Sequence, residues 1–186
     1  MELKQAIVER HAVRSYSPRA VDERSLRLLL EAAIRAPSGR NEQPWSFVVI
    51  QNRKQLMRYA EQARVLLAAT ASEHESAASR ALLRGNVDVF HGAGTLIVIC
   101  GNRSDAFAEA DCWLAAENLM LTACDQGLGS CPVGSALPLL NSRSVKAELS
   151  IPDDVAAIAP VVVGFADEPV RRSTPRAAPK IWSFWR

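Results

Sequence analysis

The chain has 186 residues, 48% of them hydrophobic, and its 22 basic and 20 acidic residues give a net charge of +2. These values suit one globular domain, residues 1–186, and give no strong case for a nucleic-acid or anionic-membrane partner. No apolar run approaches the roughly 20 residues that span a bilayer, and the start of the chain lacks a signal-peptide core. We therefore expect a soluble, cytoplasmic protein.

The first half of the chain predicts helices around one strand. Apolar residues at helical spacing predict a helix over 2–9, and Asp22 is a suitable N-cap for a second helix that stops before Pro37. A strand follows at 47–51. Further helices are expected over 54–71 and, in a more polar stretch, over 72–84.

The second half contains the most apolar elements. Residues 95–100 form a continuous apolar run, which is typical of a strand buried on both faces. The longest predicted helix, 105–126, is small and apolar almost all round, so we expect it to be central, with Gly127 ending it. A short strand near 130–131, a helix over 137–149 and a strand over 158–165 complete the prediction.

The cysteines and histidines do not form a recognisable catalytic or metal-binding pattern. They are Cys100, Cys112, Cys124, Cys131, His11, His74 and His91. The absence of a CxxC pair and the apolar context favour reduced core thiols and no metal site. With no H-E-x-x-H and no G-x-S-x-G motif, no dedicated acid–base pair is visible, which suits an enzyme whose cofactor supplies the chemistry.

Residues 35–45 are the most informative stretch, because a polar loop with two prolines and a glycine connects a helix to a buried strand. Ser38, Asn41 and Gln43 can hydrogen-bond a planar heterocycle while the prolines hold them in place. The sequence predicts a ligand-contacting loop, and a plain structural turn is the alternative.

Two other segments have the chemistry of a binding site. Arg10, His11 and Arg14 can grip a phosphate or the polar edge of a flavin, unless the arginines only pair with nearby surface acids. The glycine-rich segment 127–135 allows close backbone approach to a ligand, and its N–H groups could donate to a ring nitrogen. A simple helix stop followed by a turn is the alternative there.

The segment 167–186 ends in Ile181-Trp182-Ser183-Phe184-Trp185 after several prolines. Such aromatic residues are costly to leave in water, so this arm is expected to pack on a surface, either of a second subunit or of its own domain.

Taken together, these segments resemble the nitroreductase family of flavin enzymes. The matching blocks are 10–16, 36–45, 111–134 and 175–176, in the family's order, and the P-S-G-x-N-x-Q-P-W block is the most specific. The resemblance implies an α+β fold with a central mixed, mainly antiparallel sheet flanked by helices. It also implies a homodimer that exchanges its C-terminal arms and shares two FMN sites.

The resemblance further implies a set of flavin contacts. Arg10, His11 and Ala12 would contact the phosphate and ribityl region, Arg14 the pyrimidine edge of the ring, and Arg176 the phosphate. Pro37, Ser38 and Asn41 would come from the other subunit, and Pro132, Val133 and Gly134 would face the ring, with the Val133 N–H near N5. Many members have Ser where Ala12 stands, and some have Lys where Thr174 stands.

The function that follows is an FMN-dependent oxidoreductase in which NADH or NADPH reduces nitroaromatics, quinones or similar electron-poor acceptors by a ping-pong mechanism. Arg14 would stabilise negative charge on the flavin. The alternative from a different class is a non-redox flavin-binding or regulatory protein on the same fold. A specialised reductase such as a dehalogenase is a third possibility, although such enzymes usually add a lid insertion.

Overall fold

The computed structural model describes residues 1–70, 88–102, 105–167 and 175–185. The helix predicted over 72–84 lies outside the described residues, as does Thr174.

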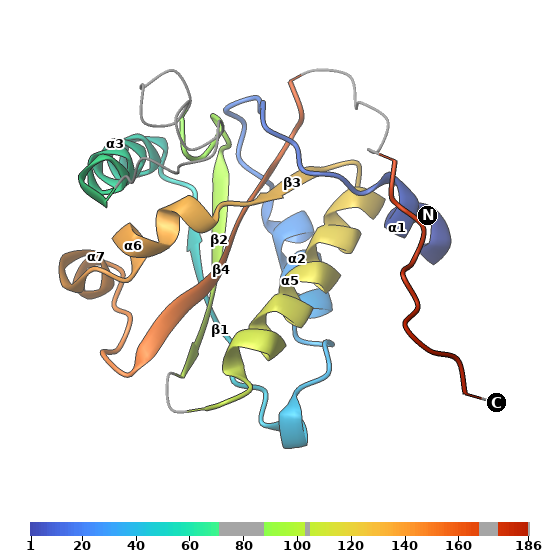
Figure 1. Ribbon diagram of the computed structural model, residues 1–186. Coiled ribbons are helices and arrows are strands. Elements are labelled where there is room, and N and C mark those ends of the chain that lie inside the picture. The colour runs from blue at the N-terminus through green and yellow to red at the C-terminus, as the bar shows by residue number, and fades with distance from the viewer. Residues whose placement is uncertain (71–87, 103–104, 168–174, 186) are drawn as a thin grey trace.

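A four-stranded sheet forms the centre of the molecule, with strand order β1-β2-β4-β3 (Figure 1). The strands are β1 (Ser46–Ile50), β2 (Thr95–Asn102), β3 (Gly129–Pro132) and β4 (Val155–Gly164). All three strand pairs are antiparallel, and the one parallel pairing in the described part of the chain is an isolated bridge between Ala12 and Ser130. The predicted α+β fold and its four strands are therefore confirmed, with only the strand ends shifted.

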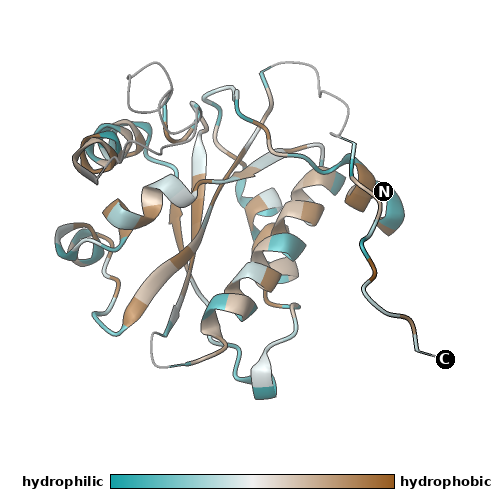
Figure 2. Cartoon of the chain, in the orientation of Figure 1, coloured by the Kyte–Doolittle hydropathy of each residue, from teal (hydrophilic) through white to brown (hydrophobic). Residues whose placement is uncertain are grey.

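Helices cover both faces of this sheet (Figure 1). One face packs against α2 (Glu23–Ala33) and α5 (Ala108–Asp125), and the other against α3 (Arg53–Thr70), α6 (Leu137–Leu140) and α7 (Arg143–Glu148). Alternate residues of β2 point to the two sides, because Val98 belongs to one core cluster and Ile97 and Ile99 to the other. This double burial explains the apolar run at 95–100, and Figure 2 shows the strands hydrophobic over much of their length.

The long helix α5 is central, as predicted, since it packs against α2 on one side and the sheet on the other. Its inward stripe is buried throughout, whereas Leu114 on the opposite side is 45% exposed. Gly127 ends the helix as expected, with a φ of +71° that favours glycine and an N–H that donates to the Cys124 carbonyl at 3.0 Å.

The helix predicted over 137–149 is instead two short helices, α6 and α7. Asn141 lies at the break, where its side chain donates to the Ala157 carbonyl at 2.9 Å and accepts from the Ala157 N–H at 3.0 Å. Ser142 then caps α7 by accepting from the Val145 N–H. The bonds from Asn141 to β4 redirect the chain, so the helix breaks although the apolar pattern suggested one continuous helix.

The two ends of the chain lie on the same side of the molecule (Figure 1). Helix α1 (Leu3–Glu9) packs against α5, and the Met1 ammonium pairs with Asp125. The C-terminal segment 175–185 is extended and does not cover its own domain, because Trp182 is 86% and Trp185 93% exposed. None of the helices in the described segments combines the length and hydrophobicity needed to cross a bilayer.

Candidate functional site

Backbone pairing brings the cationic segment 10–14 beside β3. Ala12 forms the parallel bridge to Ser130, and the Val13 N–H donates to the Ser130 carbonyl at 3.0 Å. The approach requires glycine at position 129, because a Cβ there would lie 2.8 Å from the Val13 side chain. Two segments far apart in the sequence, 10–14 and 129–134, therefore share one surface.

A cavity of about 230 Å³ lies beside this pairing, at the C-terminal end of α5. Its lining includes Arg10, His11 and the backbone of the glycine-rich turn 127–130. The Arg10 Nε is buried without a hydrogen-bond partner in the described structure, although it lies 3.2 Å from Oε1 of Glu117. Arg10 and Glu117 therefore form an ion pair without hydrogen-bond alignment. We call this the Arg10 pocket.

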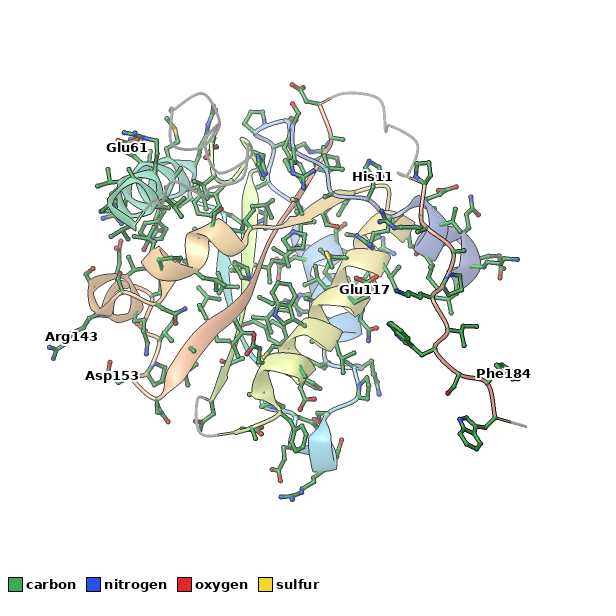
Figure 3. All side chains as sticks on the ribbon, viewed as in Figure 1. His11, Glu61, Glu117, Arg143, Asp153 and Phe184 are labelled. Carbon is green, nitrogen blue, oxygen red and sulfur yellow. The ribbon has the colours of Figure 1, made fainter. Side chains whose placement is uncertain are left out.

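His11 leaves one ring nitrogen available at the Arg10 pocket. Its Nδ1 lies 2.9 Å from the Glu9 carbonyl, and because a carbonyl only accepts, Nδ1 must carry the proton. Nε2 then accepts a bond in the neutral ring or donates one in the imidazolium. Figure 3 shows His11 at the edge of the sheet and Glu117 on the side of α5 that faces α1.

Arg14 is exposed, and its charge influences the buried Tyr16 and Cys131 and the partly buried His91. Burial and then the Arg14 charge lower the pKa of His91, whereas burial raises the pKa of Cys131 and the Arg14 charge partly opposes this. Burial also raises the pKa of Tyr16, whose hydroxyl has no hydrogen-bond partner among the described residues. His91, in a turn with a φ of +56°, was not predicted near the site.

The turn 132–134 differs from expectation in one contact. The Val133 N–H donates to the Pro160 carbonyl at 2.9 Å, so the expectation that this N–H faces a ring nitrogen is wrong. Gly134 is exposed, a Cβ added there would meet nothing within 4 Å, and no hydrogen bond in the described structure uses its N–H. Gly134 therefore offers the open backbone donor of this turn, while Pro132 and Val133 remain predicted lining residues.

The loop 37–44 is tightly cross-bonded and strained. Ser38 Oγ accepts from the Gln43 N–H at 3.0 Å, and the Ser38 carbonyl accepts from the Asn41 N–H at 3.0 Å. Arg40, Asn41 and Gln43 all have φ between +49° and +60°, although none is glycine. Each such residue costs on the order of 1–3 kcal/mol, and strain of this kind is concentrated at functional sites. This favours the ligand-contacting interpretation over a plain turn.

One buried carboxylate ties this loop to α5, and the sequence did not identify it. Asp111 is only 4% exposed, and its Oδ2 accepts from the Gly39 N–H at 3.0 Å. The available signal was an acidic residue on the apolar stripe of the helix, next to Cys112 and one turn before Ala115.

The structure separates the predicted residues into two groups. The loop with Ser38 and Asn41 meets the N-terminal end of α5, whereas the Arg10 pocket lies at the other end of this 18-residue helix, which is about 27 Å long (Figure 1). Arg176 is exposed in segment 175–185, and no hydrogen bond or ion pair between described residues joins it to either group. The described residues also contain no cluster of His, Cys, Asp or Glu that could hold a metal ion.

The family model for the Nitroreductase family matches residues 7–165. The chain belongs to the nitroreductase family. The strained loop and the whole sheet fall inside the matched region, as do all residues that line the Arg10 pocket except Met1 and Ala166.

Individual relatives support this assignment. A putative NADH dehydrogenase/NAD(P)H nitroreductase from Archaeoglobus fulgidus is 28% identical over 88% of this chain and 85% of its own length. A nitroreductase with bound FMN from Desulfitobacterium hafniense superposes with a TM-score of 0.79 at 27% identity, covering 97% of this chain and 95% of its own. Another with bound FMN, from Bacteroides fragilis, shares the fold with a TM-score of 0.84 at 24% identity over 97% of this chain and 98% of its own.

The four cysteines of the chain differ in burial. Cys100, Cys112 and Cys131 are at most 2% exposed, and burial raises the pKa of Cys100 to about 11 and that of Cys112 to about 12. Cys124 is only partly buried and lines the Arg10 pocket. The first three lie in the core, as predicted, whereas Cys124 does not.

We therefore predict that a thiol-reactive aromatic disulfide at pH 8 modifies Cys124 first. The other three thiols should react only after unfolding in denaturant, because they are both inaccessible and protonated at that pH. Mass spectrometry of peptides from the folded and the denatured protein measures this order. Rapid labelling of Cys112 in the folded protein would contradict the burial described above.

Proposed function

We propose that this protein is an FMN-dependent oxidoreductase that uses NADH or NADPH to reduce nitroaromatics, quinones or similar electron-poor acceptors. The observation that carries the proposal is the Arg10 pocket, where a buried guanidinium nitrogen lacks a hydrogen-bond partner in a member of the nitroreductase family. Homologous structures contain bound FMN, and relatives carry NAD(P)H nitroreductase names.

The residues present fit the polar end of FMN. Arg10 and His11 supply donors beside a glycine-rich turn, and a phosphate would satisfy the Arg10 Nε that now lacks a partner. The pairing of Arg10 with the half-exposed Glu117 is worth little in water, so it offers weak competition. Ala12, which has no polar side chain, would contribute main-chain atoms only.

Further along the same surface, the chain offers groups for the ring. Arg14 is an exposed cation within electrostatic reach of His91 and Cys131, and Gly134 presents an open N–H. We place Arg14 at the pyrimidine edge of the ring, where a fixed cation stabilises negative charge. Pro132 and Val133 would line the same face.

The separation of the two groups supports a site shared by two subunits. One copy of the loop 37–44 lies at the opposite end of α5 from its own Arg10 pocket, so Pro37, Ser38 and Asn41 of one copy would complete the pocket of another. The cavity of about 230 Å³ is also smaller than the roughly 300–1,000 Å³ of typical ligand sites. The exposed aromatic arm would hold the copies together, and Arg176 would reach the phosphate through it.

Bound FMN supplies hydride acceptance from the nicotinamide and electron transfer to the acceptor. The protein contributes binding, orientation and charge, and we assign no protein acid–base residue. The nicotinamide and the acceptor would occupy the same space in turn, which gives ping-pong kinetics. The same geometry would equally suit a non-redox flavin-binding protein, so one experiment must separate the two.

We predict that the FMN-loaded protein loses its visible flavin absorbance when NADH or NADPH is added without oxygen. Addition of a quinone or nitroaromatic should then restore the absorbance. A protein that holds FMN stoichiometrically but keeps its absorbance with both nucleotides would be a binding module, and failure to take up FMN at all would overturn the proposal.

Replacement of Arg10 by Ala is predicted to weaken FMN binding by about ten-fold or more, because a hydrogen bond to a charged group is worth about 1.5–3 kcal/mol. Fluorescence titration of the apoprotein with FMN gives the dissociation constant. Arg143→Ala is the matched control, since this exposed arginine begins α7 on the far side of the sheet from His11 (Figure 3). Equal affinities in the two variants would refute the role of Arg10.

Replacement of Trp182 and Trp185 together by Ala is predicted to shift the protein toward monomer and to weaken FMN binding in parallel. Each indole buries about 150–250 Å² when it docks, so the dimer loses much of its apolar contact. Sedimentation velocity at several concentrations measures the change. Met57→Ala is the control, because this residue is 62% exposed on α3, on the other side of the sheet. A dimer of unchanged strength would show that the arm has another task.

A further inference from the structure

Asp111 is the one buried carboxylate among the described residues. Core packing alone does not explain why a charged residue stands at this position. It lies in the first turns of α5, among small apolar neighbours, where an unpaired charge would be strongly unfavourable. Its side chain bonds not to its own helix but to the loop before β1, where Oδ2 accepts from the Gly39 N–H at 3.0 Å.

The same end of α5 holds Gly39 by packing as well. A Cβ on Gly39 would lie 3.0 Å from the ring of Phe107, the residue that precedes the helix, so backbone and ring are in close contact. Gly39 is therefore held by the carboxylate through one hydrogen bond and by the aromatic ring through van der Waals contact.

The loop that Asp111 holds is rigid within itself. Ser38 Oγ and the Ser38 carbonyl accept two of its N–H groups, and the Gly39 carbonyl accepts a third, from Glu42, at 3.0 Å. These bonds fix the shape of the loop, including the positive φ of Asn41, but they do not fix where the loop lies on the body of the protein. Within the described part of the chain, the bond from the Gly39 N–H to Asp111 is the hydrogen bond that crosses from the loop to α5.

We propose that Asp111 is a positioning residue for the flavin, acting through this loop. By holding the Gly39 N–H, the carboxylate sets Ser38 and Asn41 at the height along α5 from which they reach the FMN of the other subunit. The inference rests on the proposed function, because it requires that these two residues contact the flavin. Asp111 itself remains buried and touches no cofactor.

The test measures FMN affinity by fluorescence titration of the full-length apoprotein, with thermal unfolding of each apo variant as a check of folding. Asp111→Ala is expected to raise the dissociation constant about ten-fold, as loss of a charge-assisted bond would. Asp111→Asn keeps an oxygen that accepts from Gly39 and should stay within about three-fold of the unchanged protein. Glu109→Ala, which removes an exposed carboxylate from the same turn, should have no effect.

A double-mutant cycle separates positioning from a general loss of structure. In an Asn41→Ala background one of the two flavin contacts that Asp111 positions is already gone, so Asp111→Ala should weaken the affinity less than it does in the unchanged protein. A merely structural role would weaken binding equally in both backgrounds.

Three results would overturn the inference alone: additive effects in the cycle, unchanged affinity in folded Asp111→Ala, or failure of both Asp111 variants to fold, which would make the carboxylate a stability residue. In each case the unchanged protein still binds FMN. If the unchanged protein does not bind FMN, the proposed function fails and this inference fails with it.

Discussion

Burial of the sheet on both faces is the constraint on which the rest of the structure depends. β2 has its apolar residues almost fully buried, so the central strands have no surface on which to build a polar site. Polar chemistry is confined to the connections: the segment 10–14, the loop before β1 and the turn after β3. Each of these is anchored to the sheet or to α5 by long-range backbone contacts, such as the bridge from Ala12 to Ser130.

Helix α5 turns these separate connections into one arrangement. Its C-terminal end borders the Arg10 pocket, and its N-terminal end holds Gly39 through Asp111. A straight helix is a stiff spacer, so the distance between the two groups is set by its 18 residues and not by the loops themselves. If the site is shared as proposed, the same helix that fills the core also keeps the two groups of one copy too far apart to form one site.

The sequence predicted what depends on local pattern. The apolar run of β2, the Asp22 cap and the stop at Gly127 were all found, because propensity, capping and burial act over a few residues. It did not predict what depends on partners distant in the chain. Asn141 breaks a helix through bonds to Ala157, Val133 gives its N–H to Pro160, and the carboxylate of Asp111 meets Gly39, 72 residues away.

The placement of the two groups at opposite ends of α5 also has a genetic consequence. Suppose that each pocket takes Arg10 from one chain and the loop from the other. A mutation of Arg10 in one copy and a mutation of the loop in its partner then affect the same pocket. The second pocket of that mixed pair then contains only intact parts. Two different defective alleles expressed together would restore activity that neither has alone, whereas two copies of the same allele would not.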